Sequence, residues 1–235
     1  MALPIINAPQ FETTIPSTNQ KIFFRPFLVK EEKILFVALQ GGEMSEIVNA
    51  IKNILRECII DNVDVDKLAT FDLEYLFLQL RSKSVGEEIN LRLNHQSGEC
   101  THRQDVTILV DDVKVNFDPQ HTDKVMIDDN IGIKFKYPNF KLIEQFQSVD
   151  SNDMQQLFDL LLSCVDFVYD QDNVYDQFTD EELKNFFDAL NQKQFNKVTS
   201  FFNTLPRLSH TIEWTCDKCG ESEKVVLEGL SNFFT

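Results

Sequence analysis

The sequence predicts an α+β fold, in which helices and strands occupy separate stretches of the chain. Apolar residues repeat at helical spacing in residues 43–59 and 152–170, whereas apolar and polar residues alternate in residues 105–117. The strands come in runs and do not alternate with helices, which favours α+β over a parallel α/β sheet. The predicted order is a helical N-terminal part, a small central antiparallel sheet, a helical segment and a C-terminal β-hairpin with a CxxC knuckle.

The N-terminal part is expected to begin extended and then to become helical. Residues 1–20 are rich in Pro, Thr and Asn, and residues 21–27 are β-prone. Pro26 places the second stretch at a sheet edge or a strand end, because proline cannot donate to the ladder. Helices are predicted at 30–39, 43–59 and 70–84. The second helix is clearly amphipathic, with an apolar stripe formed by Ile47, Ile51, Ile54, Leu55 and Cys58.

The remainder of the chain is expected to hold two groups of strands separated by helices. Alternation predicts central strands at 87–93, 105–117, 123–127 and 131–137, with turns at 94–104, 118–122 and 128–130. Helices are predicted at 152–170, 179–192 and 193–205. Thr179 and Glu182 form a capping box at the start of one helix, and Pro206 ends another. Strands at 210–214 and 223–229 flank the CxxC turn.

This order divides the chain into four segments that make up one or two compact units. They are an N-terminal arm, strand and helices at 1–85, an antiparallel sheet at 86–140, a helical segment at 141–206 and the knuckle-like hairpin at 207–235.

The amino-acid composition argues against some classes of binding partner. The 235 residues carry a formal net charge of −16, which repels phosphate backbones and argues against nucleic-acid binding. No stretch approaches the roughly 18 consecutive apolar residues of a membrane span, and the N-terminus lacks the pattern of a signal peptide. We therefore expect an acidic cytosolic protein. Its 21 Phe residues need burial against each other or against a partner.

The sequence "TCDKCGE" predicts half of a zinc knuckle. Cys216 and Cys219 lie in a tight turn between two strands, and Gly220 lets backbone amides approach the sulfurs. A structural zinc takes four tetrahedral ligands, so two more are needed. The predicted turn at 94–104 offers Cys100 and two histidines, His95 and His102. A site of three cysteines and one of these histidines would bind one structural zinc and tie the middle sheet to the C-terminal hairpin.

Two other interpretations of the cysteines remain open. The turn could be reduced and metal-free, or it could have a thioredoxin-like redox role, although such motifs open a helix after a strand. The odd count of five cysteines argues against a disulfide framework. The acidic stretch at 166–182 fails the calcium-loop template, because Val174 and Tyr175 occupy its fifth and sixth positions. Known nucleophile, phosphate-loop and zinc-protease motifs are missing from the sequence, which favours a non-enzymatic protein.

Partner-binding residues are predicted from concentrated basic charge and from aromatic residues. The basic spots lie at residues 25–27 and 81–87, and aromatic pairs lie at Phe201, Phe202 and near the C-terminus. The predicted partner-binding set is Arg25, Phe27, Arg81, Lys83, Phe233 and Phe234. Each of these residues also has a purely structural interpretation, as a local ion pair or as part of the core.

Three stretches resemble one family of proteins. They are "IPSTNQKIFFRPFLVKEEKILFVAL", "FDLEYLFLQLRSKSVGEEI" and "CDKCG" followed by "LEGLSNFF". This order of segments resembles the baseplate hub subunits and baseplate hub assembly proteins of T4-type bacteriophages. Members of that family often have cysteine pairs in both hairpins, whereas here the first pair is reduced to Cys100 with nearby histidines.

The resemblance implies a non-enzymatic phage tail protein that acts in assembly of the central hub of the baseplate. Its partners would be other hub or tape-measure proteins, met in the host cytoplasm during assembly or in the tail baseplate of the virion. Two alternatives stay open: a structural hub subunit retained in the virion, and a zinc-ribbon-bearing enzyme or regulator with no recognisable catalytic motif.

Overall fold

The structure is a computed structural model, and it describes residues 7–97, 100–147 and 154–230. It combines helices with small antiparallel sheets and a C-terminal hairpin, so the predicted α+β class is confirmed. The chain divides into two compact units, one formed by residues 1–116 and 207–235 and the other by residues 117–206. The four-segment division drawn from the sequence stays a prediction.

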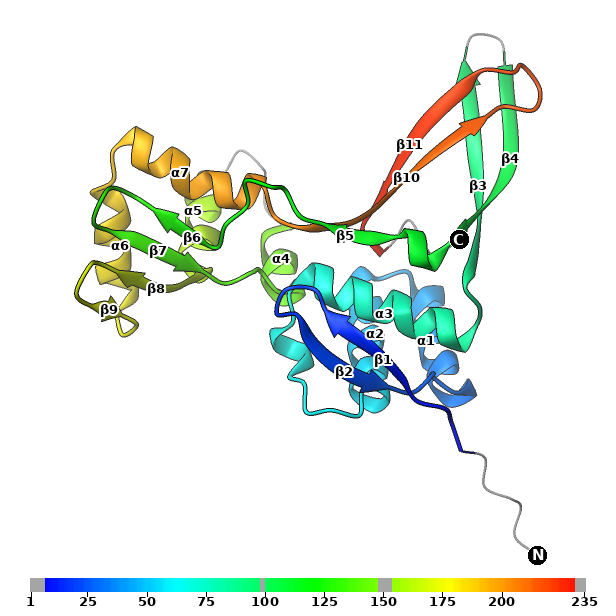
Figure 1. The fold of residues 1–235 in the computed structure, drawn as a ribbon, viewed down its shortest axis with the longest axis horizontal. Helices are drawn as coiled ribbons and strands as arrows, with labels where there is room; N and C mark the ends of the chain where they lie inside the picture. The colour runs from blue at the N-terminus through cyan, green and yellow to red at the C-terminus, as the bar shows by residue number, and fades with distance from the viewer. Residues whose placement is uncertain (1–6, 98–99, 148–153, 231–235) are drawn as a thin grey trace, which may run out of the picture. The chain divides into compact units, whose positions relative to one another are not determined.

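The first unit joins the N-terminal half of the chain to its C-terminal hairpin (Figure 1). Its helices are α1 (Val29–Gly41), α2 (Met44–Cys58) and α3 (Thr70–Ser84), with short 3-10 turns η1 (Val65–Lys67) and η2 (Val110–Asp112). Its strands are β1 (Phe11–Ile15), β2 (Gln20–Phe24), β3 (Glu88–Ser97), β4 (Cys100–Leu109), β5 (Lys114–Asn116), β10 (Arg207–Thr215) and β11 (Ser222–Glu228). The strands form antiparallel pairs β1–β2 and β3–β4 and the three-stranded sheet β11–β10–β5.

Helix α3 carries apolar residues into two cores of this unit. Phe77 packs with the β1–β2 hairpin and α2 in the first core, where Ile22 and Ile54 are also buried. Leu78 packs in the second core with Trp214 and the inner residues of β3 and β10. An apolar surface on two sides of one helix explains why its sequence shows no single stripe.

A buried ion pair fixes the start of α1. Glu31 is almost fully buried, and its carboxylate accepts hydrogen bonds from Arg25 Nη2 at 2.9 Å and from the backbone N–H of Leu28 at 2.8 Å. Burial opposes the charge on Glu31, but these bonds and Lys30 outweigh it and hold its pKa below the ordinary value. The pair orients the chain between β2 and α1.

The β3–β4 hairpin is longer than the sequence predicted. The expected turn at 94–104 is wrong: β3 continues to Ser97, and β4 begins at Cys100. The buried positions of β3 are Ile89, Leu91, Leu93 and then His95, at every second residue. The series of inward-facing residues therefore ends with a polar side chain. The last part of β3 thus lacks the alternation of apolar and polar residues that predicts a strand.

The second unit is a four-stranded antiparallel sheet with helices. Its strands, in the order β6–β7–β8–β9, are β6 (Lys124–Met126), β7 (Gly132–Phe135), β8 (Val165–Tyr169) and β9 (Val174–Tyr175). Its helices are α4 (Phe140–Gln147), α5 (Met154–Ser163), α6 (Asp180–Asp188) and α7 (Gln192–Asn203). Stacked rings of Phe135 and Phe201, with centroids 4.8 Å apart, lie in its core, and Phe202 meets Phe201 edge-on. The capping box predicted at Thr179 and Glu182 is confirmed.

Two assignments in this unit differ from the sequence predictions. The helix expected at 152–170 ends at Ser163, and its second half is strand β8, which lies between β7 and β9. Val165 and Val168 of β8 are buried. Hydrogen bonding to a strand on each side and the β-branched valines favour a strand here over continuation of the helix. Helix α4 was not predicted.

Glu74 gives the first unit a testable pH dependence. Its Oε1 accepts a hydrogen bond from the N–H of Leu230 at 3.2 Å, and burial raises its pKa from 4.5 to about 7. The folded chain therefore binds a proton there that the unfolded chain releases, so stability is lost as pH rises from about 4.5 through about 7. We expect Glu74→Gln, which keeps the acceptor oxygen, to raise the free energy of unfolding by about 3 kcal/mol at pH 8 and by less than about 1 kcal/mol at pH 5.

Urea unfolding followed by the fluorescence of Trp214 measures this effect, because the single tryptophan lies in the core of this unit. The exposed Glu57→Gln on α2 is the matched control. Equal changes at both pH values for Glu74→Gln would contradict a raised pKa.

Candidate metal centre

The C-terminal half of the centre is a tight turn between β10 and β11. Cys216 directly follows β10, its N–H donates to the carbonyl of Glu221 at 2.8 Å, and the N–H of Gly220 donates to its carbonyl at 2.8 Å. Gly220 adopts φ 77°, a left-handed conformation that favours glycine. The turn places Cys219 beside Cys216, and the backbone amides of Cys219 and Lys218 donate to the Cys216 sulfur.

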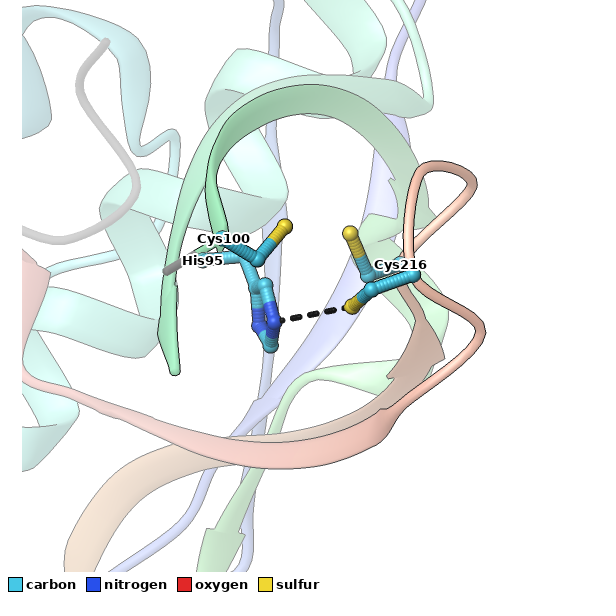
Figure 2. A group of neighbouring side chains, drawn as sticks. His95, Cys100 and Cys216 are labelled. Carbon is cyan, nitrogen blue, oxygen red and sulfur yellow. Dashed lines mark hydrogen bonds between the residues drawn. The ribbon is translucent and has the colours of Figure 1, made fainter. Parts of the chain in front are cut away.

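The other half comes from the end of the β3–β4 hairpin. His95 on β3 is 1% exposed, and Cys100 on β4 is half-buried. One ligand atom from each of His95, Cys100, Cys216 and Cys219 lies within 4.8 Å of the other three. Figure 2 shows His95 and Cys100 of one hairpin directed toward Cys216 of the other. The two halves are held in register by Gln104, whose side chain bonds to the backbone of Thr215 and Asp217.

The imidazole of His95 is oriented by groups on both sides. Its Nε2 lies 3.2 Å from the sulfur of Cys219, as the dashed line in Figure 2 marks, and its Nδ1 lies 2.6 Å from Oε1 of Glu223. The contact with Glu223 lacks hydrogen-bond geometry at Nδ1, and Oε2 of Glu221 lies 3.5 Å from Nε2, so carboxylates flank both ring nitrogens. Trp214 packs edge-on against the ring, with centroids 5.9 Å apart, and is the cross-strand partner of Glu223.

Cys216 and Cys100 differ in pKa because their surroundings differ. Burial opposes ionisation of Cys216, but the amides of Cys219 and Lys218 and the thiols of Cys219 and Cys100 outweigh it and lower its pKa. Burial and hydrogen bonds to Cys219 and Cys216 raise the pKa of Cys100 to about 11. Cys216 is thus converted to the metal-binding thiolate more readily than Cys100 is.

The donor set fits a four-coordinate metal ion. Sulfur ligands at about 2.3 Å from a tetrahedral metal lie about 3.8 Å apart, so a group already within 4.8 Å needs only a small contraction. Three thiols and one imidazole are soft and borderline ligands, and a carboxylate on the distal nitrogen of the histidine is the usual outer partner. This arrangement can bind a metal ion and cross-link the two hairpins.

The structure brings together four of the five predicted metal ligands. His102 lies directly opposite His95 in the β3–β4 register, on the same face of the hairpin, but it is outside the group of four. Glu223 and Trp214 were missed by the sequence analysis. The alternation of β11 places Glu223 opposite Trp214, but a chain with 38 acidic residues offers no reason to single out one carboxylate.

The predicted partner-binding residues fall on the first unit. Arg25 pairs with Glu31, Phe27 is buried, and Lys83 pairs with Glu87. Arg81 is half-buried, and its Nη1 has no hydrogen-bond partner within the described part of the chain. Phe233 and Phe234 lie outside the described residues.

Comparison with known families identifies the chain. A family model described as T4 bacteriophage base plate protein matches residues 8–235. The chain belongs to this family of phage baseplate proteins. The resemblance seen in the sequence to T4-type baseplate proteins is therefore confirmed. No curated protein and no solved structure matches the chain.

The family directs attention to other phage proteins as partners and to the tail baseplate of the virion as the place of action. Within residues 7–97, 100–147 and 154–230, none of the helices has the length and apolar character needed to cross a bilayer.

Two histidine variants test which imidazole belongs to the centre. His95→Gln and His102→Gln each remove a ring from the same face of the hairpin. We expect His95→Gln to weaken binding of Co²⁺ at least about tenfold, because a direct ligand is lost, and His102→Gln to leave it unchanged. Titration followed by the visible absorption of tetrahedral Co²⁺ measures both. Equal losses in the two variants would contradict the assignment of His95.

Proposed function

We propose that this baseplate protein acts without catalysis in assembly of the central hub, by binding other hub or tape-measure proteins. The observation that carries the proposal is the family match over residues 8–235. Binding would occur in the host cytoplasm while the tail is being built. Retention of the protein in the finished particle is the alternative within the same proposal.

We also propose that the metal is one structural zinc, held by His95, Cys100, Cys216 and Cys219. Zinc takes Cys₃His sets in structural sites, and catalytic zinc sites keep one position open for water or substrate. Here the chain supplies four ligands, which supports a structural role. The thioredoxin-like alternative has less support, because the CxxC turn joins two strands and does not open a helix.

The surface supports a protein that works by contact. The net charge of −16 suppresses self-association, while exposed apolar side chains offer contact energy to a partner. The predicted partner-binding residues Arg25, Phe27, Arg81, Lys83, Phe233 and Phe234 stay part of this proposal.

An assembly defect is the expected consequence of losing the protein. A phage that carries a nonsense mutation in its gene should accumulate no complete baseplates, and expression of the intact chain from a plasmid should restore them. Electron microscopy of infected-cell lysates measures the outcome. Normal tails without the protein would overturn the proposed function, whereas probing purified particles with an antibody separates a transient assembly factor from a retained subunit.

Loss of the metal should loosen the first unit. We expect about one zinc per chain in the purified protein and little in Cys216→Ser, because one of the four ligands is removed. Chelation should lower the melting temperature reported by Trp214, which touches His95. Lys218→Ala is the matched control, since Lys218 is exposed and contributes only its backbone to the turn.

Metal analysis together with thermal melts tests this point. A metal-free protein that melts at the same temperature as the untreated one would contradict a structural zinc. The other proposal, on hub assembly, would be unaffected by that result.

A further inference from the structure

The three thiols of the metal centre differ in their exposure to solvent. Cys219 is exposed in the knuckle turn, Cys100 is half-buried at the start of β4, and Cys216 is 1% exposed and belongs to the core that contains Trp214. Oxidation of a thiol depends on its access to solvent as well as on its ionisation. A small oxidant in solution therefore reaches the sulfur of Cys219 first.

Cys219 has two other sulfurs within reach. One ligand atom from each of Cys100, Cys216 and Cys219 lies within 4.8 Å of the others, and hydrogen bonds join the thiol of Cys100 to those of Cys219 and Cys216. The sulfurs of a disulfide are about 2.05 Å apart, so two of these thiols bond after an approach of less than about 3 Å.

The knuckle turn favours Cys100 over Cys216 as the partner of Cys219. The sulfur of Cys216 accepts hydrogen bonds from the backbone amides of Cys219 and Lys218, which hold it inside the turn. A bond between Cys216 and Cys219 would pull that sulfur away from these amides. Cys100 approaches from the other hairpin, so its bond to Cys219 leaves the amides on Cys216 in place.

We propose that Cys219 is a site of thiol oxidation, where a peroxide forms a Cys100–Cys219 disulfide that releases the metal and keeps the two hairpins joined. Cys100 begins β4, and Cys219 lies between β10 and β11, so the disulfide joins the same two hairpins as the metal. His95 and Cys216 would remain of the four ligands, which is too few for a structural zinc. The release of metal rests on the proposed structural zinc, whereas the disulfide rests on the thiols alone.

The reaction balances with hydrogen peroxide as the oxidant. The Cys219 sulfur attacks one peroxide oxygen, the O–O bond breaks, and the sulfur becomes a sulfenic acid as one water leaves. The Cys100 sulfur then attacks the Cys219 sulfur, the S–S bond forms, the S–O bond breaks, and a second water leaves. The two sulfurs lose two electrons, which reduce the peroxide. Both protons come from the thiols, or from solvent where the sulfurs react as metal-bound thiolates.

The surroundings of the chain decide which cross-link persists. The host cytoplasm keeps thiols reduced and available to a metal, whereas the surface of a particle outside the cell is in an oxidising environment. The family to which the chain belongs acts in the baseplate of the tail. A chain retained in the particle would therefore exchange the metal for the disulfide at lysis.

Peroxide treatment of the purified, zinc-loaded protein tests the oxidation site. We expect one disulfide and about one released zinc per chain, with the disulfide mapped to Cys100 and Cys219 by peptide mass spectrometry. Cys219→Ser should slow the reaction at least about tenfold, because the exposed sulfur is lost. Cys100→Ser should leave a sulfenic acid on Cys219 that dimedone traps. Cys164→Ala, buried in the second unit, is the control and should react as the wild type does.

The mapping of the wild-type disulfide needs no substitution, so it decides the inference even if a ligand variant is unfolded. A Cys100–Cys219 disulfide, in a protein whose Trp214 signal melts at a higher temperature than that of the reduced and chelated protein, supports the inference. A disulfide between Cys216 and Cys219, a disulfide between two chains, or zinc release without any disulfide overturns it. Absence of zinc from the purified protein would instead overturn the structural zinc, and the mapped disulfide would still decide the oxidation site.

Discussion

The first unit depends on contact between the β3–β4 and β10–β11 hairpins. They meet at the end where His95, Cys100, Cys216 and Cys219 lie. The β3–β4 pair has ten residues in each strand, and its inward series of apolar side chains ends at Leu93. A two-stranded hairpin is marginal in water unless one face is covered. Here His95, Cys100, Cys216 and Cys219 meet at the end of that series, where Cys216 belongs to the core and Gln104 bonds to the backbone of Thr215 and Asp217.

Residues around the four candidate ligands contact these ligands. Glu223 and Trp214 are cross-strand neighbours, and both contact the His95 ring. The hydrogen bonds of the knuckle amides to Cys216 favour its thiolate. A group of four candidate ligands with fixed neighbours is suited to a rigid, structural metal site.

The net charge and the exposed apolar side chains have opposite effects on association of this protein. A net charge of −16 keeps copies apart, yet α1 presents exposed Val29, Phe36 and Val37 around Lys33. Repulsion between copies discourages nonspecific adhesion.

The sequence by itself determined the α+β class, the amphipathic α2, the capping box at Thr179 and the cysteines of the centre, because these follow from local periodicity and spacing. It could not choose between His95 and His102, which lie opposite each other on the same face of one hairpin. It also placed a helix over β8, whose strand conformation depends on pairing with β7 and β9. The sequence could not identify Glu223 either, because its contact with His95 joins strands that are distant in sequence. Which imidazole turns inward, which carboxylate orients it and which stretch becomes a central strand are decided by partners distant in sequence, and only the tertiary structure brings those partners together.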